Sequence, residues 1–167
     1  PELYAEKLSR NVSMRVSIRK AVSGGLPCIA ECGGFMYLTQ AIAGFPMAGV
    51  LPGGCFDTGK LTRFGYVTLT AQKDNLLCRA GEQIHAHEFH HWDAETPGSS
   101  FSAEKPSGKR WLCVHASDTL YAGFRIFIFT QIRHLPSGFW TLAERNPAML
   151  EQIKPMDIEM RSFEIIT

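Results

Sequence analysis

The chain has 167 residues, 45% of them hydrophobic, and 17 basic against 16 acidic residues give a net charge of +1. This length suits one folded domain, and basic residues gather nowhere in the density that nucleic-acid binding needs, so we expect no nucleic-acid partner. The five cysteines include no Cys-x-x-Cys pair, and the apolar stretches are too short to span a bilayer, which predicts a cytoplasmic protein without disulfides or a membrane partner.

The first region, residues 2 to 22, has the pattern of an amphipathic helix. Leu8, Val12 and Val16 recur every four positions among basic residues, which predicts that they form one apolar stripe. The apolar run from Leu26 to Ala30 is typical of a short strand that is buried on both faces. A helix followed by such a strand is the first indication of an α/β fold.

The chain then turns at Gly33-Gly34 and resumes helical spacing. Phe35, Leu38 and Ile42 follow that spacing, and Gly44 ends it. Beyond residue 54, apolar and polar residues alternate and β-formers are frequent, which predicts strands at 65–70, 83–92, 111–115 and 119–124.

Cys32 stands between the predicted strand and the predicted helix. A sharp strand-to-helix turn lifts one side chain off the edge of a sheet, and the two glycines that follow allow a tight backbone. The start of a helix is expected to lower the pKa of the thiol and to offer backbone N–H groups to a developing oxyanion. The string Glu31-Cys32-Gly33-Gly34 therefore predicts a nucleophilic cysteine with a sparsely populated backbone conformation.

A structural role is the alternative for every cysteine, because cysteine is among the most buried residue types. That alternative suits Cys28, which lies inside the predicted strand. Cys55, Cys78 and Cys113 have no setting comparable to that of Cys32, so we assign them no role.

Residues 87 to 91 read His-Glu-Phe-His-His, which matches the His-Glu-x-x-His pattern of zinc proteases. That chemistry needs both histidines one turn apart on a helix, with the glutamate as general base. The segment between Gly81 and Pro97 is too short and too strand-like for such a helix. We expect His87 and His91 to alternate along an extended segment, where histidines pair locally or line a cleft, and to bind no stoichiometric zinc or other metal.

Several stretches together resemble the class I glutamine amidotransferase domain of the cobyrinate (hydrogenobyrinate) a,c-diamide synthases. The matching residues are Pro1-Glu2-Leu3, the string Ala30-Glu31-Cys32-Gly33-Gly34-Phe35-Met36-Tyr37-Leu38, Gly65-Tyr66 and His87-Glu88-Phe89-His90. They span residues 1–124 in the family's order. The residue after His90 is usually Tyr in that family, and His91 in its place creates the protease-like pattern.

The resemblance implies a flavodoxin-like α/β fold, with a largely parallel sheet flanked by helices, here lacking its first strand and oxyanion loop. It implies that Cys32 forms a γ-glutamyl thioester with glutamine, and that Gly33 N–H and a Gly-Gly-Tyr loop preceding Pro1 are the oxyanion donors. Ammonia would pass to a separate domain that uses ATP and Mg to amidate the a and c carboxylates of the corrinoid cobyrinate in cobalamin biosynthesis. Residues 1–124 would need no cofactor.

The resemblance stops after Phe124. Family members continue with Pro-His-x-His-Phe-Tyr, whose second histidine is the base, and Ile128 stands at that position here. Arg125 to Pro136 can be encoded by a base sequence that, with one base added in front, is read in a shifted frame as Pro-His-Phe-His-Phe-Tyr-Ala-Asn-Pro-Ala-Phe-Ala. We interpret 125–148 as an out-of-frame tail with few core contacts, although its first apolar residues suit a strand; a divergent C-terminal helix is the alternative.

Residues 149–167 resemble the start of precorrin methylmutase, another corrin-pathway enzyme, as expected if the shifted frame ran into a neighbouring gene. Two functional hypotheses follow. The chain is either a glutamine-hydrolysing enzyme domain or a catalytically dead fragment of that domain without its base. Turnover of glutamine separates the two hypotheses, because labelling of the thiol alone does not need the base.

Overall fold

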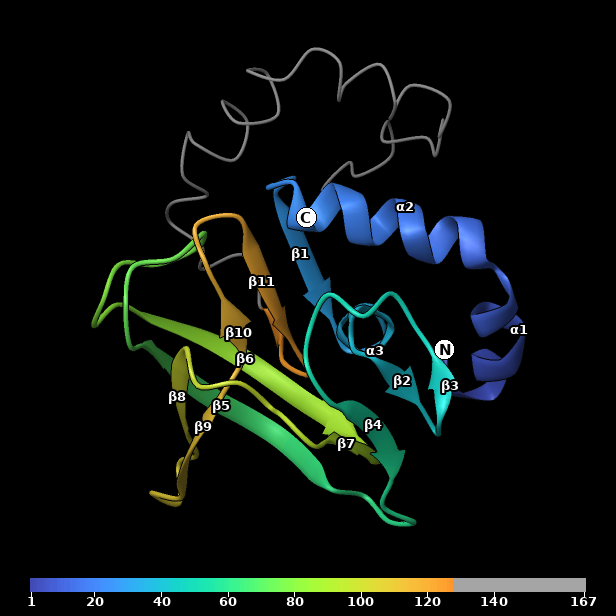
Figure 1. Ribbon diagram of the computed structural model, residues 1–167. Coiled ribbons are helices and arrows are strands. Elements are labelled where there is room, and N and C mark those ends of the chain that lie inside the picture. The colour runs from blue at the N-terminus through green and yellow to red at the C-terminus, as the bar shows by residue number, and fades with distance from the viewer. Residues whose placement is uncertain (128–167) are drawn as a thin grey trace, which may run out of the picture.

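The computed structural model describes residues 1–127, except for the side chain of Phe127 (Figure 1). The predicted tail from Ile128 onward, including residues 149–167, lies outside the described residues. The helical elements are η1 (Glu2–Tyr4), α1 (Ala5–Arg10), α2 (Val12–Ser23) and α3 (Gly33–Leu38). The strands are β1 (Cys28–Glu31), β2 (Ala41–Ile42), β3 (Phe45–Pro46), β4 (Gly54–Asp57), β5 (Arg63–Ala71), β6 (Gln83–His90), β7 (Trp92–Ala94), β8 (Phe101–Glu104), β9 (Arg110–Cys113), β10 (His115–Ala116), β11 (Leu120–Gly123) and β12 (Ile126–Phe127).

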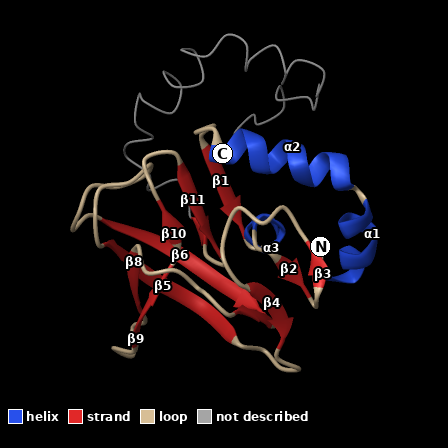
Figure 2. Cartoon of the chain, in the orientation of Figure 1, coloured by secondary structure: helices blue, strands red, loops and turns tan. Residues whose placement is uncertain are grey.

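The strands form three sheets, with α1 and α2 to one side and α3 next to β1 and β2 (Figure 2). The five-stranded sheet, in the order β12-β6-β5-β8-β9, is antiparallel throughout. The other two have the orders β1-β11-β10 and β3-β2-β4-β7. The predicted α/β class holds, but residues 1–127 do not form a largely parallel sheet. Among their named strands, only β1–β11 and β2–β4 pair in parallel. In the second half, consecutive strands are joined by connections too short for the crossover that a parallel pair needs.

The amino-terminal helix is divided at Asn11, unlike the single helix that was predicted. Asn11 leaves the helical region with φ −81° and ψ 73°, and its side chain accepts a hydrogen bond from the first turn of α2 at 3.1 Å. The division changes which face packs against the core. Val12 and Val16 are 56% and 43% exposed, so the predicted stripe is wrong there, and Ile18 and Val22 pack inward instead.

The predicted strand-turn-helix unit is present as β1 and α3, with a shorter helix. The chain leaves the helix at Thr39, whose hydroxyl donates to a carbonyl oxygen of the last turn at 2.7 Å, and Ile42 lies in β2. Ile42 is nevertheless fully buried. In β1 only Ala30 is buried and its neighbours are half-buried, so the expectation of burial on both faces is wrong.

Two predicted strands of the second half are interrupted. The strand predicted at 83–92 breaks at His91, after which β7 pairs with β4 in another sheet. The strand predicted at 111–115 breaks at Val114, whose φ is 68°. Any side chain at position 98 would collide with the Val114 carbonyl, so the close approach depends on Gly98.

Two apolar clusters form the core. One lies on the inner face of the five-stranded sheet and includes Leu69, Phe101 and Tyr121. The other surrounds α3 and includes Phe35 and Phe124. The second cluster adjoins the Cys32 turn. Among residues 1–127, no helix combines the length and apolar character needed to cross a membrane.

The first residues after Phe124 pack more specifically than expected. Ile126 and Phe127 form β12, which pairs with β6 as their apolar pattern allows. Arg125 is 2% exposed and forms an ion pair with Glu88, so the expectation of few core contacts is wrong for Arg125. A buried carboxylate attracts a cation, and the arginine side chain is long enough to reach it.

Candidate active site

Cys32 lies between β1 and α3, at the carboxyl ends of the parallel strands β1 and β11 (Figure 1). Its φ of 49° and ψ of −107° are a strained combination for a residue with a side chain. The Cys32 N–H donates to the Gly123 carbonyl oxygen at 2.8 Å, and the Met36 N–H donates to the Cys32 carbonyl oxygen at 3.0 Å. The predicted turn geometry is confirmed, and the nucleophilic role stays a prediction.

The surroundings of Cys32 raise the pKa of its thiol, whereas the sequence predicted a lower value. Burial is the largest cause, because a buried thiolate loses hydration. A hydrogen bond from the Gly33 backbone opposes burial, but the carboxylates of Glu2 and Glu31 raise the pKa further. The six-residue helix α3 does not outweigh these effects. At neutral pH the thiol is therefore mostly protonated.

Gly33, the expected oxyanion donor, begins α3 and lies against Pro1. A Cβ atom at position 33 would come within 2.7 Å of Pro1 Cδ, so the contact requires glycine. The Gly33 backbone N–H lies close enough to the Cys32 side chain to lower the pKa of the thiol. Pro1 brings the beginning of the described chain to the Cys32 turn.

The other cysteines lie in different settings. Burial raises the pKa of Cys55, Cys78 and Cys113 to about 11. Cys28 is half-buried within β1, where burial also raises the pKa of its thiol. These thiols remain protonated at neutral pH and are poor nucleophiles.

The segment 87–91 follows β6 to its end, so its histidines do not share the face of a helix. Side chains alternate between the two faces of the sheet. The ring of His87 contacts that of the exposed Phe64, with centroids 5.5 Å apart, whereas Glu88 and His90 point inward and are 0% and 5% exposed. The predicted extended segment is confirmed, and the zinc content stays a prediction.

Sequence reasoning missed an ionic cluster on the inner face of β6. A guanidinium nitrogen of Arg125 lies 2.7 Å from the Glu88 carboxylate, and His90 Nε2 lies 3.9 Å from it. Burial alone would raise the pKa of Glu88, but His90, Arg125 and Arg63 together outweigh burial and lower it. The sequence signal that could have revealed this cluster was Glu88, a charged residue at an inward-facing position of a strand with alternating polarity.

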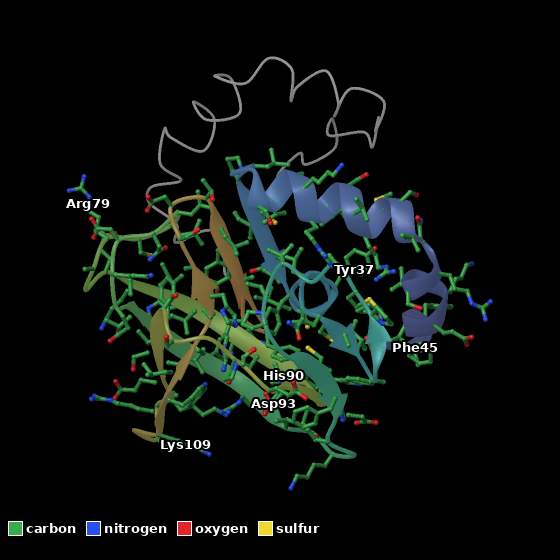
Figure 3. All side chains as sticks on the ribbon, in the orientation of Figure 1. Tyr37, Phe45, Arg79, His90, Asp93 and Lys109 are labelled. Atoms are coloured by element: carbon green, nitrogen blue, oxygen red, sulfur yellow. The ribbon has the colours of Figure 1, made fainter. Side chains whose placement is uncertain are left out.

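Two histidines approach the Cys32 turn through aromatic side chains. The His90 ring, labelled in Figure 3, stacks on Phe124 with centroids 4.3 Å apart, and the His115 ring lies 6.1 Å from Phe35. Phe35 and Phe124 meet edge to face at 5.0 Å. Within residues 1–127 neither histidine hydrogen-bonds to the thiol. His90 Nδ1 and His115 Nε2 instead lie within hydrogen-bond distance of the backbone carbonyl oxygens of Trp92 and Thr96. The position expected for the base, Ile128, lies outside the described residues.

Comparison with known proteins identifies the class of domain. Residues 1–109 match the family of CobB/CobQ-like glutamine amidotransferase domains, and the chain belongs to this family. The match includes Cys32 and the segment 87–91.

The chain is also similar to cobyrinate a,c-diamide synthases. The one from Caldanaerobacter subterraneus is 38% identical over 132 residues, which cover 74% of this chain and 29% of the relative. The Clostridium acetobutylicum relative is 33% identical over 129 residues (74% and 30%), and the Listeria monocytogenes relative is 43% identical over 100 residues (58% and 22%). The chain thus spans less than a third of the length of these relatives.

Proposed function

We propose that this chain carries the glutamine-hydrolysing domain that supplies ammonia for ATP-dependent amidation of the a and c carboxylates of cobyrinate in cobalamin biosynthesis, and that hydrolysis is impaired in this copy. The observation that supports this most is Cys32 at a strained strand-to-helix turn in a glutamine amidotransferase family domain. The names of the relatives support cobyrinate as the acceptor of the ammonia. We place the reaction in the cytoplasm.

In the proposed reaction the Cys32 thiolate attacks the carbonyl carbon of the glutamine side-chain amide. A C–S bond forms, and the amide oxygen becomes an oxyanion beside the Gly33 N–H. The C–N bond then breaks as a proton passes to the leaving ammonia, and water hydrolyses the thioester to glutamate and free thiol. Because the pKa of the Cys32 thiol is raised, a base must first remove its proton.

We place the second oxyanion donor in a loop preceding Pro1, and the contact between Pro1 and Gly33 supports that location. Helices α1 and α2 lead into β1 as in the second half of a strand-helix-strand unit, which supports a preceding strand parallel to β1 and the flavodoxin-like fold. A separate synthetase domain would bind ATP, Mg and the corrinoid.

The general base is proposed to be lost through a frame slip after Phe124, with residues 125–148 read out of frame and 149–167 read from a neighbouring gene. Restoring the frame would place histidine where Ile128 stands. The second candidate function, a catalytically dead fragment, is favoured by the raised pKa of Cys32 in the absence of that histidine.

Labelling with a chloroketone analogue of glutamine, followed by peptide mass analysis, tests the nucleophile. We expect labelling at Cys32, because a minor thiolate fraction is enough for one irreversible reaction, and we expect free glutamine to slow it. Cys28→Ser is the matched control and should label like the parent chain, whereas Cys32→Ser should not label. Labelling at Cys28 instead, or the absence of protection by glutamine, would contradict the proposal.

A further inference from the structure

Glu88 and His90, which point inward from the segment 87–91, have no part in the proposed chemistry. His90 ends β6 and is 5% exposed. Its Nδ1 lies 2.6 Å from the Trp92 carbonyl oxygen. A carbonyl oxygen only accepts hydrogen bonds, so Nδ1 carries the proton, and this bond fixes the plane of the ring.

From His90, direct contacts lead to Cys32 by two routes. The rings of His90 and Phe124 are nearly parallel, with an interplanar angle of 8°, and Phe124 is 1% exposed. Along the first route, the neighbouring Gly123 carbonyl oxygen accepts the Cys32 N–H at 2.8 Å. Along the second, the ring of Phe124 meets that of Phe35 at an interplanar angle of 78°, with centroids 5.0 Å apart, and Phe35 lies in the helix that begins directly after Cys32.

A backbone conformation like that of Cys32 persists only where its surroundings hold it in place. We propose that His90 is a positioning residue for Cys32, whose ring holds Phe124 so that Gly123 and Phe35 keep the Cys32 turn strained. This inference rests on the proposed function, in which the strained turn presents the thiol to glutamine. His90 acts through Phe124 and touches neither the substrate nor the thiol.

Removal of the flat ring at position 90 should allow the turn to relax. Cys32 then moves toward an ordinary backbone conformation, and its side chain gains contact with water. Because burial is the largest cause of the raised pKa, the thiol should ionise at lower pH. The carboxylates of Glu2 and Glu31 and the amino group of Pro1 act on the thiol in every variant.

The test is the rate of iodoacetamide alkylation of each cysteine as a function of pH, in the full chain with His90→Leu or His90→Phe. Leucine fills the core without a flat ring, and phenylalanine keeps the ring but loses the hydrogen bond to Trp92. We expect His90→Leu to raise the Cys32 rate at pH 7 about three- to tenfold, as for a thiol pKa lower by about half to one unit. His90→Phe should stay within about twofold of the parent chain, because its ring can still stack.

Phe101→Leu is the matched control, because Phe101 is a fully buried ring of the other core cluster. A gain restricted to Cys32, with Cys55 and Cys113 protected, supports the proposal. An unchanged rate in His90→Leu, equal gains at all cysteines, or the same effect from Phe101→Leu overturns it. Alkylation needs no glutamine, so a failure of the proposed function appears separately, in labelling by the glutamine analogue.

Discussion

Glu88 and Arg125 hold opposite charges 2.7 Å apart in side chains that are 0% and 2% exposed. Removing a charge from water costs several kcal/mol, and the attraction within a buried pair offsets this cost only while both partners are present. The loss of one partner therefore leaves an uncompensated charge beside Phe124. The size of this effect is measurable in the stability of the chain.

Glu88→Gln should lower the free energy of unfolding by about 3–5 kcal/mol, because it leaves the Arg125 guanidinium buried without a counter-charge. Urea denaturation at pH 7 measures the change. Glu104→Gln is the matched control, since it breaks an exposed pair with Arg110 whose atoms are 2.8 Å apart, and it should have a much smaller effect. Similar losses in the two variants would show that Glu88 and Arg125 do not act as a buried pair.

The same pair predicts a pH dependence. The folded-state pKa of Glu88 is lowered, so its stabilising contribution is present above the unfolded-state pKa of about 4.3 and is lost as the pH falls through the folded-state value. The parent chain should therefore lose more stability between neutral and acidic pH than Glu88→Gln does.

Local sequence was sufficient to predict the Cys32 turn but not the ionisation of its thiol. The turn depends on neighbours in sequence, namely the preceding strand and the two following glycines. The raised pKa depends on burial and on Glu2, which the fold brings from thirty positions away. Glu88 and Arg125 likewise meet only through tertiary structure.

At the scale of elements, the extended conformation of β6 decides which side chains of the segment 87–91 lie on the same face of the sheet. Side chains on a strand alternate between faces, so His87 and His90 face opposite ways, and β6 ends before His91. A helix would have brought the first and last histidines together on one side. The strand assignment was predictable because alternation and β-formers outweighed the short motif.

We therefore expect purified protein to hold no stoichiometric zinc. The measurement is elemental analysis of the parent chain and of His87→Ala after dialysis against a buffer that contains zinc. About one zinc per chain in the parent, lost in His87→Ala, would contradict the assignment of these residues to a strand without a metal site.

Other elements departed from their predictions for identifiable reasons. The helix predicted over 2–22 divides because Asn11 caps a new helix, a role that the apolar spacing alone does not reveal. The strand predicted at 111–115 breaks at Val114, where the chain passes against Gly98. The second break depends on a contact between distant segments, which no local pattern encodes.

For the whole molecule, the α/β class followed from the strand-turn-helix unit, and the family followed from the Cys32 string and the segment 87–90. The prediction of a largely parallel sheet was wrong for residues 1–127, because the strands within residues 54–127 are joined by short loops and pair with one another antiparallel. The predicted parallel arrangement persists at β1 and β11, where the catalytic turn is proposed.

The most direct test of the central claim is glutamine hydrolysis by two proteins, each joined to the upstream part of the Caldanaerobacter relative. One has the present chain, and the other has the restored frame, which reads Pro-His-Phe-His-Phe-Tyr from position 125 onward. We predict that activity is nearly absent in the first and rises about 10²–10⁴-fold in the second, the usual contribution of general acid–base catalysis. Cys32→Ser should abolish the recovered activity. Equal, Cys32-dependent activity in both proteins would contradict the account and would point to His90 or His115 as the base.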